Sequence, residues 1–190
     1  MNIFYLDPDP KICAEMHCDK HVCKMAIEYA QMLSTAHRVL DGTHFVGHTT
    51  NGRKITRWFH PDQLINSVLY KSTHVSHKSN KWIRESYANY DYVYQLWYWV
   101  CQEYRKRYGK THMSEYKLYG YLQLEPSSID MEKPFTEPPL AMDKYPECKV
   151  TGDAVTSYRK FYIKDKASFA KWTGTEIPFW WPHDVISDSN

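Results

Sequence analysis

The chain has 190 residues, of which 43% are hydrophobic, so it is long enough for one domain with a sizeable core. Its net charge is +2 with ten His counted as neutral, which is too small to indicate a polyanion partner by itself. No apolar run approaches the roughly 18 residues of a membrane span, and the N-terminus lacks the pattern of a signal peptide. We therefore expect no membrane partner.

The cysteines indicate a reducing compartment. Five Cys occur, at positions 13, 18, 23, 101 and 148, and none of them forms a C-x-x-C pair. An odd number without such pairs is typical of an intracellular protein. We therefore expect a cytoplasmic protein with free thiols, and the sequence leaves its oligomeric state open.

The chain opens with a short extended piece, "MNIFYLDPD", followed by a long predicted helix. Asp9 is a candidate N-cap with Pro10 at the first helical position, and an Asp-Gly pair ends the helix after about Leu40. We expect one break in this helix near Met16–Asp19.

An Asn-Gly turn lies between two short alternating runs in residues 44–59, which indicates a β-hairpin or an ordered loop. A short helix is then expected from Pro61. A second long helix is expected from about Ser79 to Tyr108, ending at Gly109, and a shorter one follows from about Ser114.

Five Pro in residues 125–151 predict an irregular arm, and a last helix is expected over 152–171. We expect residues 182–190 to form a disordered tail. The chain contains no internal repeat. The predicted fold class is therefore mainly α: a single-domain helical bundle over residues 1–190, with a short β-hairpin at 44–59 if that segment pairs.

A polar stripe follows one face of the first helix. Its members recur in steps of three and four residues, which places them on one side of a helix: His17, His21, Lys24, Glu28, Gln31 and Thr35. Three interpretations remain open. The stripe is a solvated helix face, a metal site on His17 and His21, or a metal-free acid–base site. In the last of these, Glu28 is the proton carrier or an electrostatic stabiliser, Lys24 lies nearby, and the His and Gln side chains contact substrate.

The metal interpretation has specific weaknesses. The two His stand at i and i+4, but the Glu of the zinc-binding H-E-x-x-H pattern is absent and Cys18 stands there. Residues Cys13, Cys18 and Cys23 are five apart, so their side chains diverge around the helix. We therefore expect no metal and no other cofactor.

A second cluster opens the second long helix in "THVSHKSNKWIRESYANY". Residues 71–110 carry eight Lys and Arg against three acids, whereas the chain from Met113 onward carries nine against twelve. Helix N-termini attract phosphate, so the candidates for phosphate contact are His74, His77, Lys81 and Arg84. The alternative is that these cations are only solvated. The aromatic content of 16% likewise indicates either base stacking beside cations or a Tyr-rich core.

Several stretches together resemble a family of largely uncharacterised phage proteins: "HCDKHVCKM…EYAQMLSTAHRVLDG", "THVSHKSNKWIRESYANYDY…EYRKRYGKTH", "PPLAM" and "SYRKFYIKDKASFAKW". More distantly, the order of elements resembles the pyrimidine-dimer DNA glycosylases of the phage endonuclease V type. The segment Asp19-Lys20-His21, followed nine positions after Asp19 by Glu28, is similar to that family's Asp-x-His and catalytic Glu. The segment "STAHRVLDG" is similar to the helix end that follows, and "PFWW" to an aromatic segment that helps to grip DNA.

The resemblance implies an endonuclease V-like bundle in a host-cell cytoplasm, with DNA or a nucleotide as the substrate. It implies that Glu28 is the catalytic carboxylate, that His21 contacts substrate, and that the chain's own N-terminal amine attacks C1′ of the deoxyribose. Here that amine belongs to Met1, because the bulk of Asn2 disfavours removal of the initiator Met. Within the similar segments, the substrate-contact candidates are His37, Arg38, Trp180 and Trp181.

The sequence also departs from that family, because the tract "MNIFYLDPD" extends ahead of the helix. Three functions therefore remain. The leading one is cleavage of an N-glycosidic bond using Glu28, as a DNA glycosylase with or without AP-lyase activity. The others are a non-catalytic module that binds nucleic acid or a nucleotide, and a metal-dependent hydrolase on His17 and His21.

Overall fold

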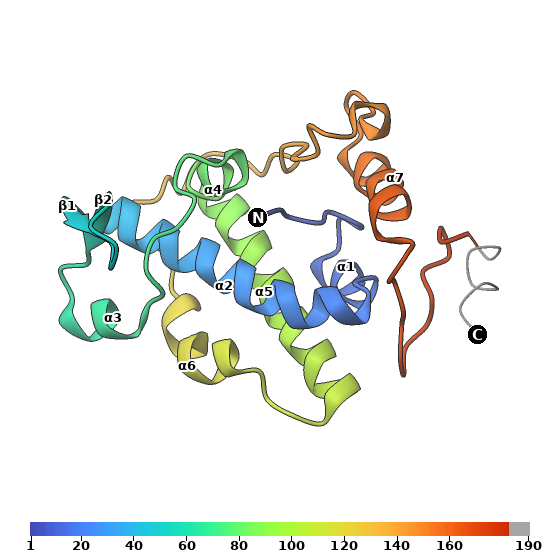
Figure 1. Cartoon of the computed structure of the whole chain (residues 1–190), viewed down its shortest axis with the longest axis horizontal. Coiled ribbons are helices and arrows are strands. Elements are labelled where there is room, and N and C mark those ends of the chain that lie inside the picture. The colour runs from blue at the N-terminus through green and yellow to red at the C-terminus, as the bar shows by residue number, and fades with distance from the viewer. Residues whose placement is uncertain (183–190) are drawn as a thin grey trace.

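The centre of the molecule is a pair of long helices, as the computed structural model in Figure 1 shows for residues 1–182, the part of the chain that is described. Helix α2 (Asp19–Asp41) packs against α5 (Tyr87–Tyr108), and the short α1 (Pro10–Glu15) packs on α5 as well. The predicted break near residues 16–19 is confirmed, since it separates α1 from α2. The predicted cap is also confirmed: the Asp9 carboxylate accepts the amides of residues 11 and 12.

The hairpin expected in residues 44–59 is confirmed. Strands β1 (Thr43–His48) and β2 (Lys54–Phe59) pair antiparallel, from Thr43 opposite Phe59 to His48 opposite Lys54. Gly52 has φ of 77°, the left-handed conformation that an Asn-Gly turn supplies. Helix α3 (Gln63–Val68) follows.

The second long helix is interrupted, which corrects the expected continuous span of 79–108. Helix α4 (Lys78–Ile83) ends before α5 starts at Tyr87, because Ser86 adopts an extended conformation and caps the new helix through its hydroxyl. The predicted end is confirmed, since Gly109 follows α5 with φ of 66°. Helix α6 is Met113–Leu122.

The C-terminal third contains little regular structure. The predicted irregular arm contains a single short 3-10 turn, η1 (Pro146–Cys148), and α7 (Ala154–Lys166) is shorter at both ends than the predicted helix over 152–171. The tail expected to be disordered lies outside the described residues except for its first member, residue 182. No helix within residues 1–182 is long and apolar enough to cross a membrane.

One hydrophobic core extends from the N-terminal segment to Trp181, and Tyr side chains fill much of it. Tyr29, Tyr90, Tyr158 and Tyr162 are fully buried, and each hydroxyl forms a hydrogen bond. Much of the high aromatic content therefore serves packing. Residues Ile3–Leu6 also lie in this core, which fixes the N-terminal segment against the body of the protein.

Candidate active site

The N-terminal segment carries Met1 back to the middle of α2. The Phe4 amide donates to the Tyr29 hydroxyl of α2 at 3.3 Å. The Asn2 side chain donates to the Ala141 carbonyl at 3.0 Å and accepts from the Tyr158 hydroxyl at 2.9 Å. These buried and partly buried contacts fix the position of the chain's first residue.

The α-amine of Met1 lies beside Glu28. The nitrogen is 3.9 Å from Glu28 Oε2, and Lys24 Nζ is 3.2 Å from Oε1 of the same carboxylate. Lys24 precedes Glu28 by one helical turn, so the spacing predicted from the sequence brings these two side chains together. Each oxygen of the carboxylate therefore faces a different nitrogen.

These groups line an open hollow of about 430 Å³, and His77 lines it as well. Four of the predicted site residues, Met1, Lys24, Glu28 and His77, thus share one cavity. Its other lining residues come from segments that the sequence did not mark as part of the site: Asn2, Phe4, Ala141, Met142, Asp143, Lys144, Tyr145, Phe161, Asp165 and Lys166.

Charges of both signs surround this hollow. Asp143 receives hydrogen bonds from Lys149 and Lys78, which lower the pKa of this exposed carboxyl to about 2. Burial lowers the pKa of His77, and the positive Met1 amine lowers it further. His77 is therefore held toward its neutral form, in which it accepts the Ser79 amide through Nδ1 at 3.2 Å. An imidazole next to an amine and a carboxylate is suited to proton transfer.

His17 and His21, predicted to contact substrate, lie behind this hollow in the core. His17 is fully buried, with Nδ1 2.7 Å from the Cys13 carbonyl and Nε2 2.9 Å from the Tyr29 hydroxyl. Burial lowers its pKa to about 4. Both nitrogens are used within the protein, so this residue faces neither a substrate nor a metal ion.

His21 is covered by Phe4, whose ring stacks on it with centroids 4.4 Å apart. Burial lowers the pKa of His21 to about 2, and its Nδ1 has no hydrogen-bond partner in the described part of the chain. Phe4 itself lines the hollow. The His predicted as a direct contact therefore lies one side chain away from the cavity.

The far end of the stripe has structural roles. The buried Thr35 hydroxyl donates to the Gln31 carbonyl at 2.7 Å and accepts the Thr73 amide at 3.2 Å, which joins α2 to the loop before α4. Arg38 is also buried, and its guanidinium donates to four backbone carbonyls, those of Trp58, Asn66, Leu69 and Tyr70. Neither Thr35, Gln31 nor Arg38 lines the hollow.

The predicted phosphate contacts are divided between two places. Arg84 is half-buried and donates to the Val75 carbonyl at 2.9 Å, which indicates a structural role, whereas Lys81 is exposed. His74 is exposed and lines a separate hollow beside β2. Helix α4 therefore does not gather all four residues around one phosphate.

The predicted stacking aromatics pack inward. Trp181 is 3% exposed and contacts Trp172 with ring centroids 4.9 Å apart. The Trp180 indole is partly buried and donates to the Met16 sulfur at 3.3 Å. Neighbouring Phe179 is 76% exposed, and the Arg159 guanidinium lies 5.1 Å from its ring centroid.

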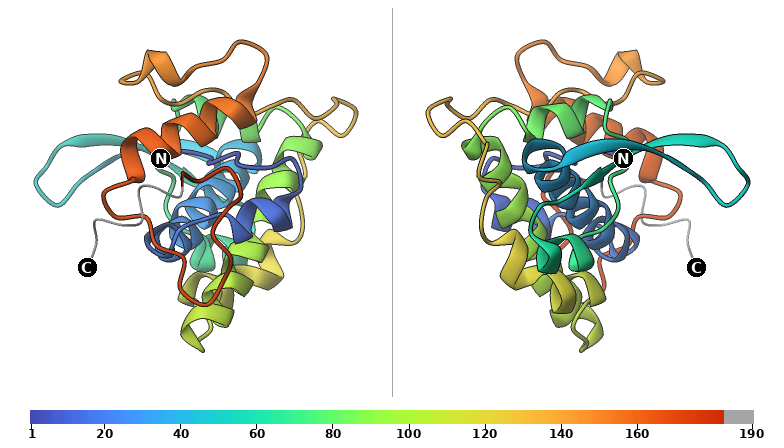
Figure 2. Two further views of the ribbon diagram at one scale, coloured as in Figure 1. Left: turned by 90° about the vertical axis from the view of Figure 1, so that its right-hand side faces the viewer. Right: turned by 90° about the vertical axis from the view of Figure 1, so that its left-hand side faces the viewer.

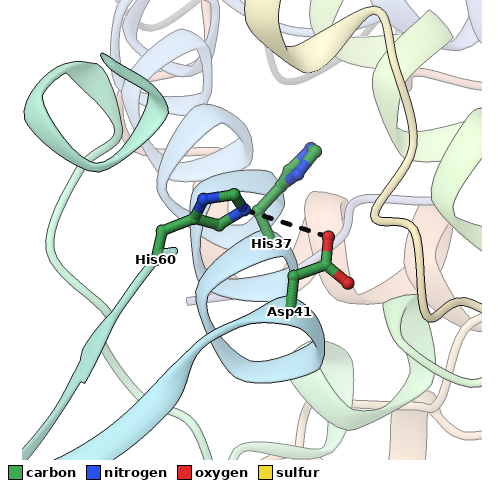
Figure 3. A group of neighbouring side chains, drawn as sticks. All are labelled: His37, Asp41 and His60. Atoms are coloured by element: carbon green, nitrogen blue, oxygen red, sulfur yellow. Dashed lines mark ion pairs between the residues drawn. The ribbon is translucent and has the colours of Figure 1, made fainter. Parts of the chain in front are cut away.

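One group in the described residues has the composition of a metal site: His37, Asp41 and His60, at the end of α2 (Figure 3). His60 Nε2 is 3.9 Å from Asp41 Oδ2. Burial raises the pKa of Asp41, but the amides of Ser127 and Ser128 offset this and lower it. His60 Nδ1 accepts the Asp62 amide at 3.2 Å, so Nε2 carries the proton of the neutral ring and is not free to bind a metal.

His37, predicted to contact substrate, belongs to this buried group. Its Nε2 lies 2.8 Å from the Tyr90 hydroxyl, and burial lowers its pKa to about 4. This hydrogen bond joins α2 to α5. Each member of the group is thus hydrogen-bonded to a residue outside it, whereas His60 Nε2 has no hydrogen-bond partner among the described residues.

The residues that sequence reasoning missed come from the N-terminal segment, from the Pro-rich arm and from α7. Lys166 and Asp165 stand in "YIKDK", where mixed charges next to aromatic residues resemble an ordinary exposed helix face. In the folded chain they line the same hollow as Met1. Comparisons of the chain with models of protein families, with curated proteins and with solved structures gave no match.

Proposed function

We propose that this chain is a DNA glycosylase of the endonuclease V-like type, which breaks the N-glycosidic bond of a nucleotide unit. The observation that carries the proposal is the 3.9 Å approach of the Met1 α-amine to the Glu28 carboxylate in an open hollow. The motif resemblance independently selects the same two groups. A cavity of about 430 Å³ suits one nucleotide flipped out of a duplex.

In the proposed reaction the unprotonated amine attacks C1′ of the sugar, a C–N bond to Met1 forms, and the bond to the base breaks. Glu28 takes the proton released by the amine and passes it on to the leaving base. Its negative charge also stabilises the cationic sugar and the imine that follows ring opening. β-Elimination from this imine would then nick the strand, which is the AP-lyase step.

The position of Lys24 supports these roles for the Met1 amine and the Glu28 carboxylate. Its ammonium group pairs with Oε1 of Glu28, so Oε2 faces the Met1 amine. The fold of the N-terminal tract supports the amine route over simple hydrolysis. The tract extends ahead of the helix in the sequence, but residues 3–6 fold back through the core, and Met1 lies beside Glu28.

The test uses protein with a free N-terminus, whose first residue is established by intact-mass measurement. Wild type, Glu28→Gln and the exposed control Glu132→Gln are assayed on uracil-containing, dimer-containing and modified-base duplexes and on free nucleotides. We expect base release by wild type and the control, and a loss of at least 100-fold in Glu28→Gln, within the range for loss of an acid–base group. Equal activity of all three proteins would overturn the role of Glu28.

The non-catalytic alternative predicts a different pattern. A binding module would retain salt-sensitive DNA binding in Glu28→Gln and release no base from any substrate in wild type. The metal-hydrolase alternative receives no support from the geometry, because His17 uses both ring nitrogens in hydrogen bonds to Cys13 and Tyr29.

A further inference from the structure

The β1–β2 hairpin projects from the helical body, as both views in Figure 2 show. All residues of β1 except Gly47 are exposed, and β2 is exposed or half-buried throughout. Large apolar side chains are among them: Phe45 is 50% exposed, Val46 65% and Phe59 48%. An isolated two-stranded hairpin is marginally stable in water and adds little to a core, so packing does not explain these exposed residues.

The hairpin and the segments after it are strongly basic. Residues 43–84 contain seven Lys and Arg against a single acid, Asp62, which gives a net charge of +6. The chain as a whole carries only +2, so positive charge is concentrated in this part. The hairpin itself contains Arg53, Lys54 and Arg57 and no acid at all.

The base of the hairpin is hollowed beside these cations. A hollow of about 630 Å³ lies between β2 and residues 71–76, and its lining includes Arg57, Lys71 and His74 but no carboxylate. Among residues 1–182, the Arg57 guanidinium forms a single long hydrogen bond of 3.4 Å, to the Ser72 carbonyl. Arg57 and Lys71 also line a smaller hollow of about 300 Å³, together with Phe45 and Phe59.

We propose that the β1–β2 hairpin and the loop 71–76 form an arm that holds duplex DNA beside the reacting nucleotide. Cations without neighbouring acids suit the phosphate backbone, and a two-stranded β-ribbon fits the width of the major groove. The substrate class is therefore a double-stranded polynucleotide and not a free nucleotide. This inference rests on the proposed function only for the location of the reacting nucleotide.

The length of α2 sets the span of the contact. Glu28 and Asp41 are separated by 13 residues of one helix, or about 20 Å at 1.5 Å per residue. At 3.4 Å per base pair this corresponds to roughly six base pairs of DNA. The arm thus grips the duplex about half a helical turn away from the reacting position.

The experiment measures binding without turnover. Fluorescence anisotropy with a labelled 20-base-pair duplex compares the wild type, a triple variant Arg53→Gln, Lys54→Gln, Arg57→Gln, and a charge-matched control, Lys110→Gln, Lys117→Gln, Lys171→Gln. We expect the hairpin variant to bind at least tenfold more weakly at 0.1 M salt, with the slope of log K against log salt reduced by about 2 to 3. We expect the control to bind within about twofold of wild type.

Equal weakening in the two triple variants, or none in the hairpin variant, would overturn the inference. Tighter binding to single-stranded DNA or to phosphatidylserine vesicles at the same phosphate concentration would also overturn it. A second hairpin variant, Arg53→Gln with Lys54→Gln, changes only exposed side chains and covers the case in which replacing the half-buried Arg57 disturbs folding. Hairpin-dependent duplex binding with no base release on any DNA would leave this inference standing and overturn the proposed function alone.

Discussion

His17 lies in the break between α1 and α2, and it tests directly whether the predicted polar stripe is partly core. The neutral ring donates from Nδ1 to the Cys13 carbonyl, and its Nε2 accepts the Tyr29 hydroxyl, which itself accepts the Phe4 amide. Protonation would place a second N–H against the Tyr29 hydroxyl and break this chain of hydrogen bonds. Burial accordingly lowers the pKa of His17 to about 4, against about 6.5 in the unfolded chain.

The sign and size of the effect follow from linkage. Because the pKa of His17 is lowered by folding, its stabilising contribution is complete above about pH 6.5 and is lost as the pH falls toward 4. At pH 5 the unfolded chain binds nearly one proton more than the folded one at this site, whereas at pH 7 both are mostly neutral there. With pKa values of about 4 and about 6.5, the integrated loss is about 2 kcal/mol over that interval.

The assay is urea unfolding followed by Trp fluorescence at pH 7 and pH 5, for wild type, His17→Gln and His48→Gln. Wild type should lose about 2 kcal/mol more than His17→Gln on going to pH 5. His48→Gln removes an exposed imidazole and controls for the loss of one His. The buried His21 and His37 keep some acid sensitivity in every variant, since burial lowers their pKa values too. An identical pH dependence in wild type and His17→Gln would refute the reasoning.

Two further predictions concern stability. The Arg107 side chain is fully buried and pairs with Glu103 at 2.9 Å and Asp19 at 3.1 Å. Arg107→Met should therefore lower the free energy of unfolding in urea by about 3–5 kcal/mol. The control Arg105→Met, at a half-exposed position, should lower it by less than about 1 kcal/mol. Comparable losses in the two variants would contradict the role of the buried pair. Gly42→Ala should destabilise the protein, because a Cβ there would lie 2.3 Å from the Arg38 carbonyl oxygen. The control Gly120→Ala places its Cβ in open space on α6 and should stabilise the protein by about 1 kcal/mol. A higher melting temperature for Gly42→Ala would count against the described end of α2.

Much of the fold could be predicted because its boundaries are local. Asp9 caps α1, Gly109 ends α5 in the left-handed conformation, and the Asn-Gly pair turns the hairpin. The break before α5 was missed, since Ser86 is a cap only in the extended conformation that it adopts here. Short-range chemistry thus determines most element ends, and tertiary structure determines this one.

The site could be predicted only in part, because its members come together through long-range contacts. Helical spacing places Lys24 beside Glu28, and this pair was correctly brought together. The same spacing grouped His17 and Thr35 with them, yet the N-terminal segment covers one end of the stripe and the loop before α4 covers the other. No pattern in the sequence indicates that residues 1–6 cross α2, which is what brings Met1 into the hollow.

The central claim is that the Met1 amine is the nucleophile beside Glu28, and borohydride trapping tests it most directly. Protein with a free N-terminus is mixed with a duplex that contains an abasic site, reduced with sodium borohydride, digested and analysed by mass spectrometry. We expect a covalent DNA adduct on the N-terminal peptide at Met1, and none when the α-amine is acetylated. An absent adduct in the unmodified protein, or an adduct on Lys24 in place of Met1, would contradict the account.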